Sequence, residues 1–264
     1  MPQAADANAR FWRISTAGIF FQGGAAAVDT STIVAALVHG LTGSAFAVGA
    51  AAAIARFGWL FPQLLRGSFD ILVGDRRFRL FLIAQWLCGA AAMALPFYIL
   101  QAQGSAPDVA FLLGAQTAGA LLSNPLWGWW GDRRGKRELL EIVAALGAVA
   151  PILTLAWIAN DARWGAAALP YFAVVFVLLG AVGNGGTIAY LGYLMEISPD
   201  DRRPAYSGYF NALAAPAALL PMAGGIVAQA ASFAAVFAVS VAAAALQFLT
   251  VRCLRAIPVE GSER

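Results

Sequence analysis

Residues 128–137, with the sequence GWWGDRRGKR, are the stretch that decides the fold. They join two long apolar runs, 109–130 and 139–159. A run of about 20 apolar residues is long enough to cross a membrane as a helix. The sequence therefore predicts two membrane spans connected by a short loop that is rich in glycine and basic residues.

The composition of the 264-residue chain is that of an integral membrane protein. Apolar residues make up 61% of the chain and charged residues 12%, whereas a soluble domain carries about a quarter charged residues. The alternation typical of a β-barrel is absent, so the predicted fold class is all-α, a polytopic bundle of membrane helices. The basic residues gather at the ends of apolar runs, and the net charge of +3 therefore gives no indication of nucleic-acid binding.

Eight transmembrane helices are predicted from the apolar runs, and no cleavable signal peptide is expected. Basic residues occupy alternate connections and both ends of the chain, so the positive-inside rule predicts that both termini are cytoplasmic. The abundance of alanine and the preference for arginine over lysine indicate a high-GC bacterial genome, and the expected location is the bacterial inner (cytoplasmic) membrane. The predicted helices are 14–38, 45–65, 78–100, 109–130, 139–159, 169–195, 206–231 and 233–251.

The glycine-rich stretch resembles the signature loop of the major facilitator superfamily, Gly-x-x-x-Asp-Arg-x-Gly-Arg/Lys-Arg/Lys, at every defining position. Residues 41–44 and 58–65 resemble the first two helices of that family, and 75–79 and 123–128 resemble the entry to the seventh helix and part of the eighth. The resemblance implies a secondary transporter of a small solute, in which two six-helix lobes rock about a central cavity.

On this resemblance, residues 75–264 correspond to a complete C-terminal six-helix lobe. Residues 1–74 correspond to a two-helix remnant of the first lobe and a cytoplasmic linker, and equivalents of helices three to six are not found. Two functions stay open. One is transport, with a homodimer completing the pathway; the other is a transport-inactive scaffold or accessory subunit that binds a membrane partner protein. A segment lost from the gene model is a further explanation.

Asp29 and Arg56 are the ionisable residues deepest in the predicted spans. Burying either one alone costs at least about 2.5–3.5 kcal/mol. We therefore expect them to pair, or to face one aqueous cavity. The pair is either a substrate- or proton-coupling site, or a structural ion pair that holds the first two helices together.

The connecting stretch has two interpretations, a conformational latch or a simple basic anchor at the membrane surface. Its glycines favour the latch, because they suit a tight turn and a close approach of helices. The family resemblance implies that Asp132 lies by a neighbouring helix N-terminus and pairs with an arginine, with Glu141 as an additional partner of Arg133 or Arg134. The latch residues are Gly128, Gly131, Asp132, Arg133, Gly135, Lys136 and Arg137.

Several uncharged polar residues lie deep in the predicted spans. Asn184 is flanked by three glycines in 183–186, which either weaken the helix and expose its backbone to a ligand or allow close helix packing. Together the polar residues would line a path; singly, each would form an interhelical hydrogen bond worth about 0.6 kcal/mol. The candidates are Gln85, Gln116, Asn124, Asn184, Tyr190 and Asn211.

Sequence motifs for catalysis or metal binding are missing. No cluster of His, Cys and carboxylate residues has metal-ligand spacing, and no phosphate-binding or nucleophile motif is present. We therefore expect neither an enzyme nor a cofactor or metal site. The expected partners are the lipid bilayer, an unidentified small solute, and a second copy or a membrane partner protein.

Overall fold

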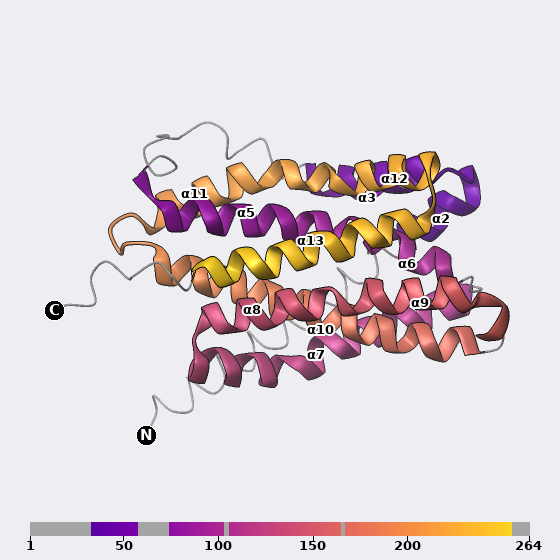
Figure 1. The fold of residues 1–264 in the computed structure, drawn as a ribbon, viewed down its shortest axis with the longest axis horizontal. Helices are drawn as coiled ribbons and strands as arrows, with labels where there is room; N and C mark the ends of the chain where they lie inside the picture. The colour runs from indigo at the N-terminus through magenta and orange to yellow at the C-terminus, as the bar shows by residue number, and fades with distance from the viewer. Residues whose placement is uncertain (1–32, 58–73, 103–105, 165–166, 255–264) are drawn as a thin grey trace, which may run out of the picture.

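The computed structural model describes residues 33–57, 74–102, 106–164 and 167–254. Every regular element in these ranges is a helix. The predicted all-α fold class is therefore confirmed, and Figure 1 shows the helices running side by side as a bundle.

Six helical segments among the described residues are long and apolar enough to cross a membrane. They confirm the last six spans predicted from the sequence. The segments are Arg76–Ala102, Asp108–Arg134, Lys136–Asn160, Ala168–Ile197, Arg203–Ala230 and Phe233–Cys253.

Some of these segments are single helices, and others are built from shorter helical elements. The elements in chain order are α5 (Arg76–Ala91), the 3₁₀ turn η2 (Ala92–Ala94), α6 (Leu95–Ala102), α7 (Ala106–Arg134), α8 (Lys136–Gly147), α9 (Val149–Trp164), α10 (Ala168–Ile197), α11 (Arg203–Ala214), the 3₁₀ turn η4 (Ala215–Leu219), α12 (Leu220–Ala230) and α13 (Phe233–Cys253). Prolines lie at the interruptions, because a proline lacks the N–H that the α-helical ladder requires. Pro216 lies in the break at η4, and Pro221 lies in the first turn of α12 directly after it.

The two predicted N-terminal spans fall partly outside the described residues. The helix α2 (Ile33–Thr42) ends four residues later than expected, and a glycine with a positive φ, Gly43, separates it from α3 (Ala45–Phe57). Asp29 and the side chain of Arg56 lie outside the described part of the structure. The prediction that these two residues pair therefore stays a prediction.

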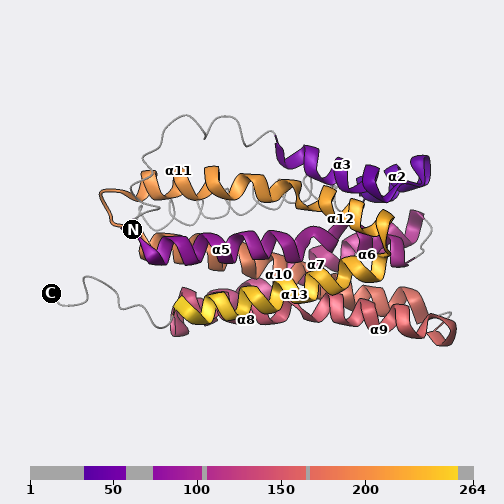
Figure 2. The same ribbon diagram turned by 45° about the horizontal axis from the view of Figure 1, so that its top comes forward.

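The helices pack in three main pairs: α10 on α7, α12 on α3, and α13 on α5. Figure 2 shows α2 and α3 along one side of the bundle, next to α12. The buried core has two aromatic clusters. One surrounds Phe97, Phe172 and Phe237, and the other surrounds Phe78 and Phe81 near the arginine-rich ends of the helices, which we call the basic end.

Candidate functional site

The expected loop at 128–137 is almost entirely helical, which corrects the sequence prediction. The helix α7 continues to Arg134, and α8 begins at Lys136. Gly135 alone lies between them, with a φ of +87° that side-chain-bearing residues rarely adopt. Arginines in the last turn of α7 complement the partial negative charge of a helix C-terminus, which explains why the helix continues through them.

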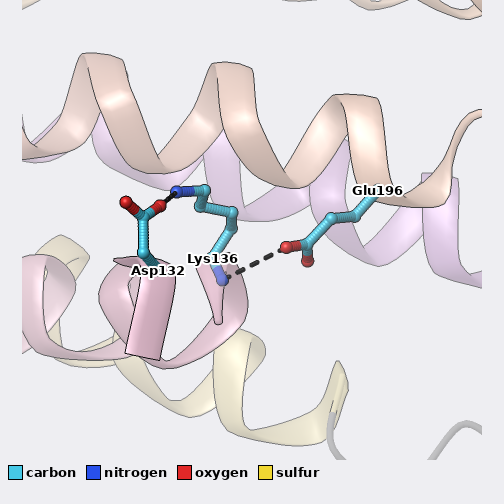
Figure 3. A network of polar contacts seen from close by, with 3 residues as sticks. All are labelled: Asp132, Lys136 and Glu196. Carbon is cyan, nitrogen blue, oxygen red and sulfur yellow. Dashed lines mark hydrogen bonds and ion pairs between the residues drawn. The ribbon is translucent and has the colours of Figure 1, made fainter. Parts of the chain in front are cut away.

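Lys136 connects the ends of three helices. Its ammonium group lies 2.9 Å from Oδ1 of Asp132 on α7, and its backbone N–H donates to Oε1 of Glu196 on α10 at 3.4 Å (Figure 3). A Cβ on Gly192 of α10 would lie 2.9 Å from the aliphatic stem of Lys136, and one on Gly131 would lie 2.9 Å from Nζ. The role expected of Gly131 in the latch stays a prediction.

The ion pairs around this connection differ from those that the family resemblance implied. Asp132 pairs with Lys136 rather than with an arginine, because four residues separate the two across the Gly135 turn. Glu141 pairs with Arg252 of α13 at 3.6 Å, a partner that the sequence did not predict. Arg134 pairs with Glu138 at 3.8 Å.

Arg137, the last residue of the latch set, is half-buried at the basic end. Its Nε atom is buried and has no hydrogen-bond partner among the described residues. It lies within electrostatic reach of Tyr193, as do Arg77 and Glu196. This grouping was not predictable from the sequence, since its members come from three helices and share no spacing.

A second group of polar residues lies where α7 crosses α10. Nδ2 of Asn184 donates to the carbonyl of Ala120 at 3.1 Å and to Oδ1 of Asn124 at 2.7 Å. The two backbones touch one turn away, where Gly180 meets the carbonyl of Gln116. The helix α10 continues unbroken through 183–186. Of the three glycines there, Gly185 packs closely against the side chains of Trp127 and Val143, whereas a Cβ on Gly183 would meet no atom within 4 Å.

We call Gln116, Asn124 and Asn184 the polar seam. Gln116 and Asn124 are eight residues apart on α7 and therefore share a face. The Asn124 side chain is exposed, and its amide N–H groups have no acceptor among the described residues. Likewise, no described residue donates a hydrogen bond to Oδ1 of Asn184. Oε1 of Gln116 is buried, also without a partner in the described part of the chain.

The polar seam lies deep in the predicted membrane region. Counted from Trp130, where the predicted span ends, Asn124 lies about 9 Å and Gln116 about 21 Å into a hydrocarbon core of about 30 Å, at 1.5 Å per residue. The seam therefore presents unused hydrogen-bond donors and acceptors near the middle of the spans.

The other candidate residues lie outside the seam. The hydroxyl of Tyr190 donates to the carbonyl of Ala84 at 2.8 Å and accepts from Gln247 at 3.0 Å, so it is used inside the bundle. Gln85 is on α5, with a buried Oε1 that lacks a partner among the described residues, and Asn211 is exposed on α11. Gln247 was missed, although a single glutamine in the apolar run of 233–251 was a signal for it.

The family comparison matches the six-helix part of the molecule. The model of the Major Facilitator Superfamily matches residues 78–264, which include the last six spans and the Gly135 turn. Neither the comparison with curated proteins nor that with solved structures gives a match. The match covers more than half of the chain and confirms the resemblance noted from the sequence.

Proposed function

The chain belongs to the Major Facilitator Superfamily, and on that premise we propose that it is a secondary transporter whose polar seam binds a small solute. The family places the chain among membrane transporters. The proposal adds the type of transport and the residues that contact the solute: Gln116, Asn124 and Asn184.

The observation that carries the proposal is the unused hydrogen-bonding capacity of the seam. A polar group that faces hydrocarbon without a partner costs free energy, because the membrane interior offers no water to replace the lost hydrogen bonds. Asn124 is exposed about 9 Å inside the predicted span, counted at 1.5 Å per residue from Trp130. Such a group is expected to face a polar solute or an aqueous pathway.

The proposal also assigns roles to the remaining candidate residues. Asp29 and Arg56 are the proposed proton-coupling pair. The connection between α7 and α8 at Gly135 and Lys136 is the proposed latch. Residues 75–264 act as one six-helix unit, and the helices of 1–74 pack against it. The basic end faces the cytoplasm of a bacterium. A second copy of the chain would supply the opposite wall of the pathway.

Uptake into proteoliposomes tests the proposal even when the solute is unidentified. Vesicles containing the protein, under an imposed pH gradient, are incubated with a mixture of water-soluble metabolites, and their contents are identified by mass spectrometry. We expect at least one solute to accumulate above the level in protein-free vesicles. Asn184→Leu is expected to lower its initial rate by about tenfold, the effect of losing roughly 1.4 kcal/mol of hydrogen bonding.

Thr187→Val is the matched control, because Thr187 lies three residues from Asn184 and its hydroxyl is already bonded to the carbonyl of Gly183 at 3.1 Å. It is expected to leave the rate unchanged. Equal losses in the two variants would argue against the seam as the binding site. The absence of any solute that accumulates would favour the scaffold function over transport.

A further inference from the structure

The helix α7 exposes more of its surface than the other spans. Of the 18 consecutive residues that are most apolar in this span, only 17% are buried in the bundle, whereas the corresponding share is 28–39% in the other five spans. One side of α7 packs on α10, and in Figure 1 the helix lies at the edge of the bundle. The described helices leave the opposite side of α7 exposed.

Four residues form a continuous stripe on that exposed side. Leu122, Leu126 and Trp129 are 80%, 50% and 50% exposed, and Arg133 follows four residues later. Spacings of four, three and four residues place all four side chains on one face of a helix. The stripe extends for eleven residues, or about 17 Å, close to half of a hydrocarbon core of about 30 Å.

The stripe ends in a cation that has no anionic partner. The guanidinium of Arg133 lies over the ring of Trp129, 5.2 Å from its centroid, and no carboxylate pairs with it among the described residues. The neighbouring Asp132 forms an ion pair with Lys136 at 2.9 Å. The lysine charge therefore reduces the repulsion between the Asp132 carboxylate and an anion bound at Arg133. An exposed arginine held above an indole is a site of positive charge at the level where interfacial tryptophans lie.

We propose that this stripe binds a phospholipid with an anionic headgroup. An acyl chain lies along Leu122 and Leu126, the indole of Trp129 lies at the level of the ester groups, and the phosphate binds the guanidinium of Arg133. The length of the stripe matches one leaflet, and its charge complements the phosphate.

A second copy of the chain is a poorer occupant of this face. Two copies related by a twofold axis along the membrane normal would bring Arg133 against Arg133, because such an interface uses the same patch on both subunits. Like charges facing each other repel, whereas a phosphate neutralises the arginine. The observations therefore favour the lipid.

Native mass spectrometry of the full chain in detergent tests the proposal, with dioleoyl phosphatidylglycerol and dioleoyl phosphatidylcholine as the added lipids. We expect phosphatidylglycerol to be retained about fivefold more strongly than phosphatidylcholine, the effect of one basic residue on an anionic lipid. Arg133→Gln is expected to remove that preference, and Arg133→Lys to keep it within about twofold.

Arg76→Gln is the matched control. Arg76 is exposed at the same basic end, but the structure records neither a ring nor an ion pair beside it in the described residues. The control is expected to leave retention of phosphatidylglycerol unchanged. The proposal is overturned by equal retention of the two lipids, by equal losses in Arg133→Gln and Arg76→Gln, or by a lipid-free dimer that Arg133→Gln dissociates.

Discussion

Gly180 and Gly183 are three residues apart in α10 but have different surroundings. A Cβ on Gly180 would overlap the backbone carbonyl of Gln116, whereas one on Gly183 would meet no atom within 4 Å. We expect Gly180→Ala to destabilise the protein by about 1–3 kcal/mol, because α7 and α10 must move apart. Thermal unfolding of the purified protein in detergent measures this change.

Gly183→Ala is the control for that measurement. It is expected to raise stability by about 0.5–1 kcal/mol, since alanine loses less backbone entropy than glycine on entering a helix. If the two variants unfolded at the same temperature, the close backbone contact of α7 with α10 would be wrong.

Lys136 provides a test of the latch against the simple anchor. The Asp132 side chain of this ion pair is 77% exposed to solvent. Because exposed ion pairs contribute little, Lys136→Met is expected to change the free energy of unfolding by less than about 1 kcal/mol. A latch predicts that the same variant alters the rate of solute uptake by roughly tenfold, the size of a typical coupling between two conformational states. Uptake into proteoliposomes and thermal unfolding measure the two effects.

Arg134→Met removes the same charge in the last turn of α7, where Arg134 pairs with Glu138 on the surface. The latch interpretation predicts that this variant transports at the wild-type rate. The anchor interpretation predicts that both variants do so, because the other arginines at the basic end would still hold the helices at the membrane surface.

The helix α5 begins at a residue with two roles. Oδ1 of Asp75 accepts the backbone N–H groups of Arg77 and Phe78 at 2.8 and 3.0 Å, and Oδ2 accepts the hydroxyl of Tyr206 on α11 at 3.0 Å. Asp75→Ala is expected to cost about 1–2 kcal/mol from the lost cap alone. Asp75→Ser is expected to recover most of that cost, since serine also caps helices, and Tyr206→Phe isolates the contribution of the α11 contact.

Chemical denaturation or thermal unfolding of the three variants separates these contributions. The order of stability expected is wild type, then Tyr206→Phe and Asp75→Ser, then Asp75→Ala. A serine variant as unstable as the alanine variant would show that the contact with Tyr206, and not the cap, holds α5 in place.

The positions of the last six spans were predictable, whereas the ends of the helices were not. Apolar runs of about 20 residues determine where a helix crosses, because each unpaired backbone group in hydrocarbon is costly. Arg133 and Arg134 were placed in a loop because charged residues were expected to end the helix. The actual end is set by the backbone of Gly135, with a φ of +87°; this glycine was expected to suit a tight turn, but the end of the helix was not placed at it.

Contacts between helices were the least predictable feature of the candidate site. Asn124 and Asn184 were each named from the sequence, but their hydrogen bond joins residues 60 positions apart. The same is true of Tyr190 and Gln247, which lie 57 positions apart. Spacing rules relate residues on one helix, so pairs on different helices depend on a packing geometry that the sequence alone does not specify.

At the scale of the molecule, the described N-terminal helices join the six-helix unit through a close contact of α3 with α12. Gly49 of α3 meets the carbonyl of Pro221, and a Cβ on Gly225 of α12 would lie 2.6 Å from the carbonyl of Ala45. The contact is backbone to backbone, and it leaves α13 and its packing on α5 and α8 untouched. The proposed division of the chain near residue 75 therefore predicts that α2 and α3 can separate from the rest without unfolding it.

Gly49→Leu tests that division, because a leucine side chain has no room against the Pro221 carbonyl. Hydrogen–deuterium exchange is expected to rise in 33–57 and in 220–230 and to stay at the wild-type level in 76–91, 136–147 and 233–253, since local opening exposes only the elements that lose their partner. Gly40→Leu is the control, as no atom lies within 4 Å of a Cβ there. Faster exchange throughout the bundle would mean that the N-terminal helices and the six-helix unit fold as one cooperative body, and the division near residue 75 would then be wrong.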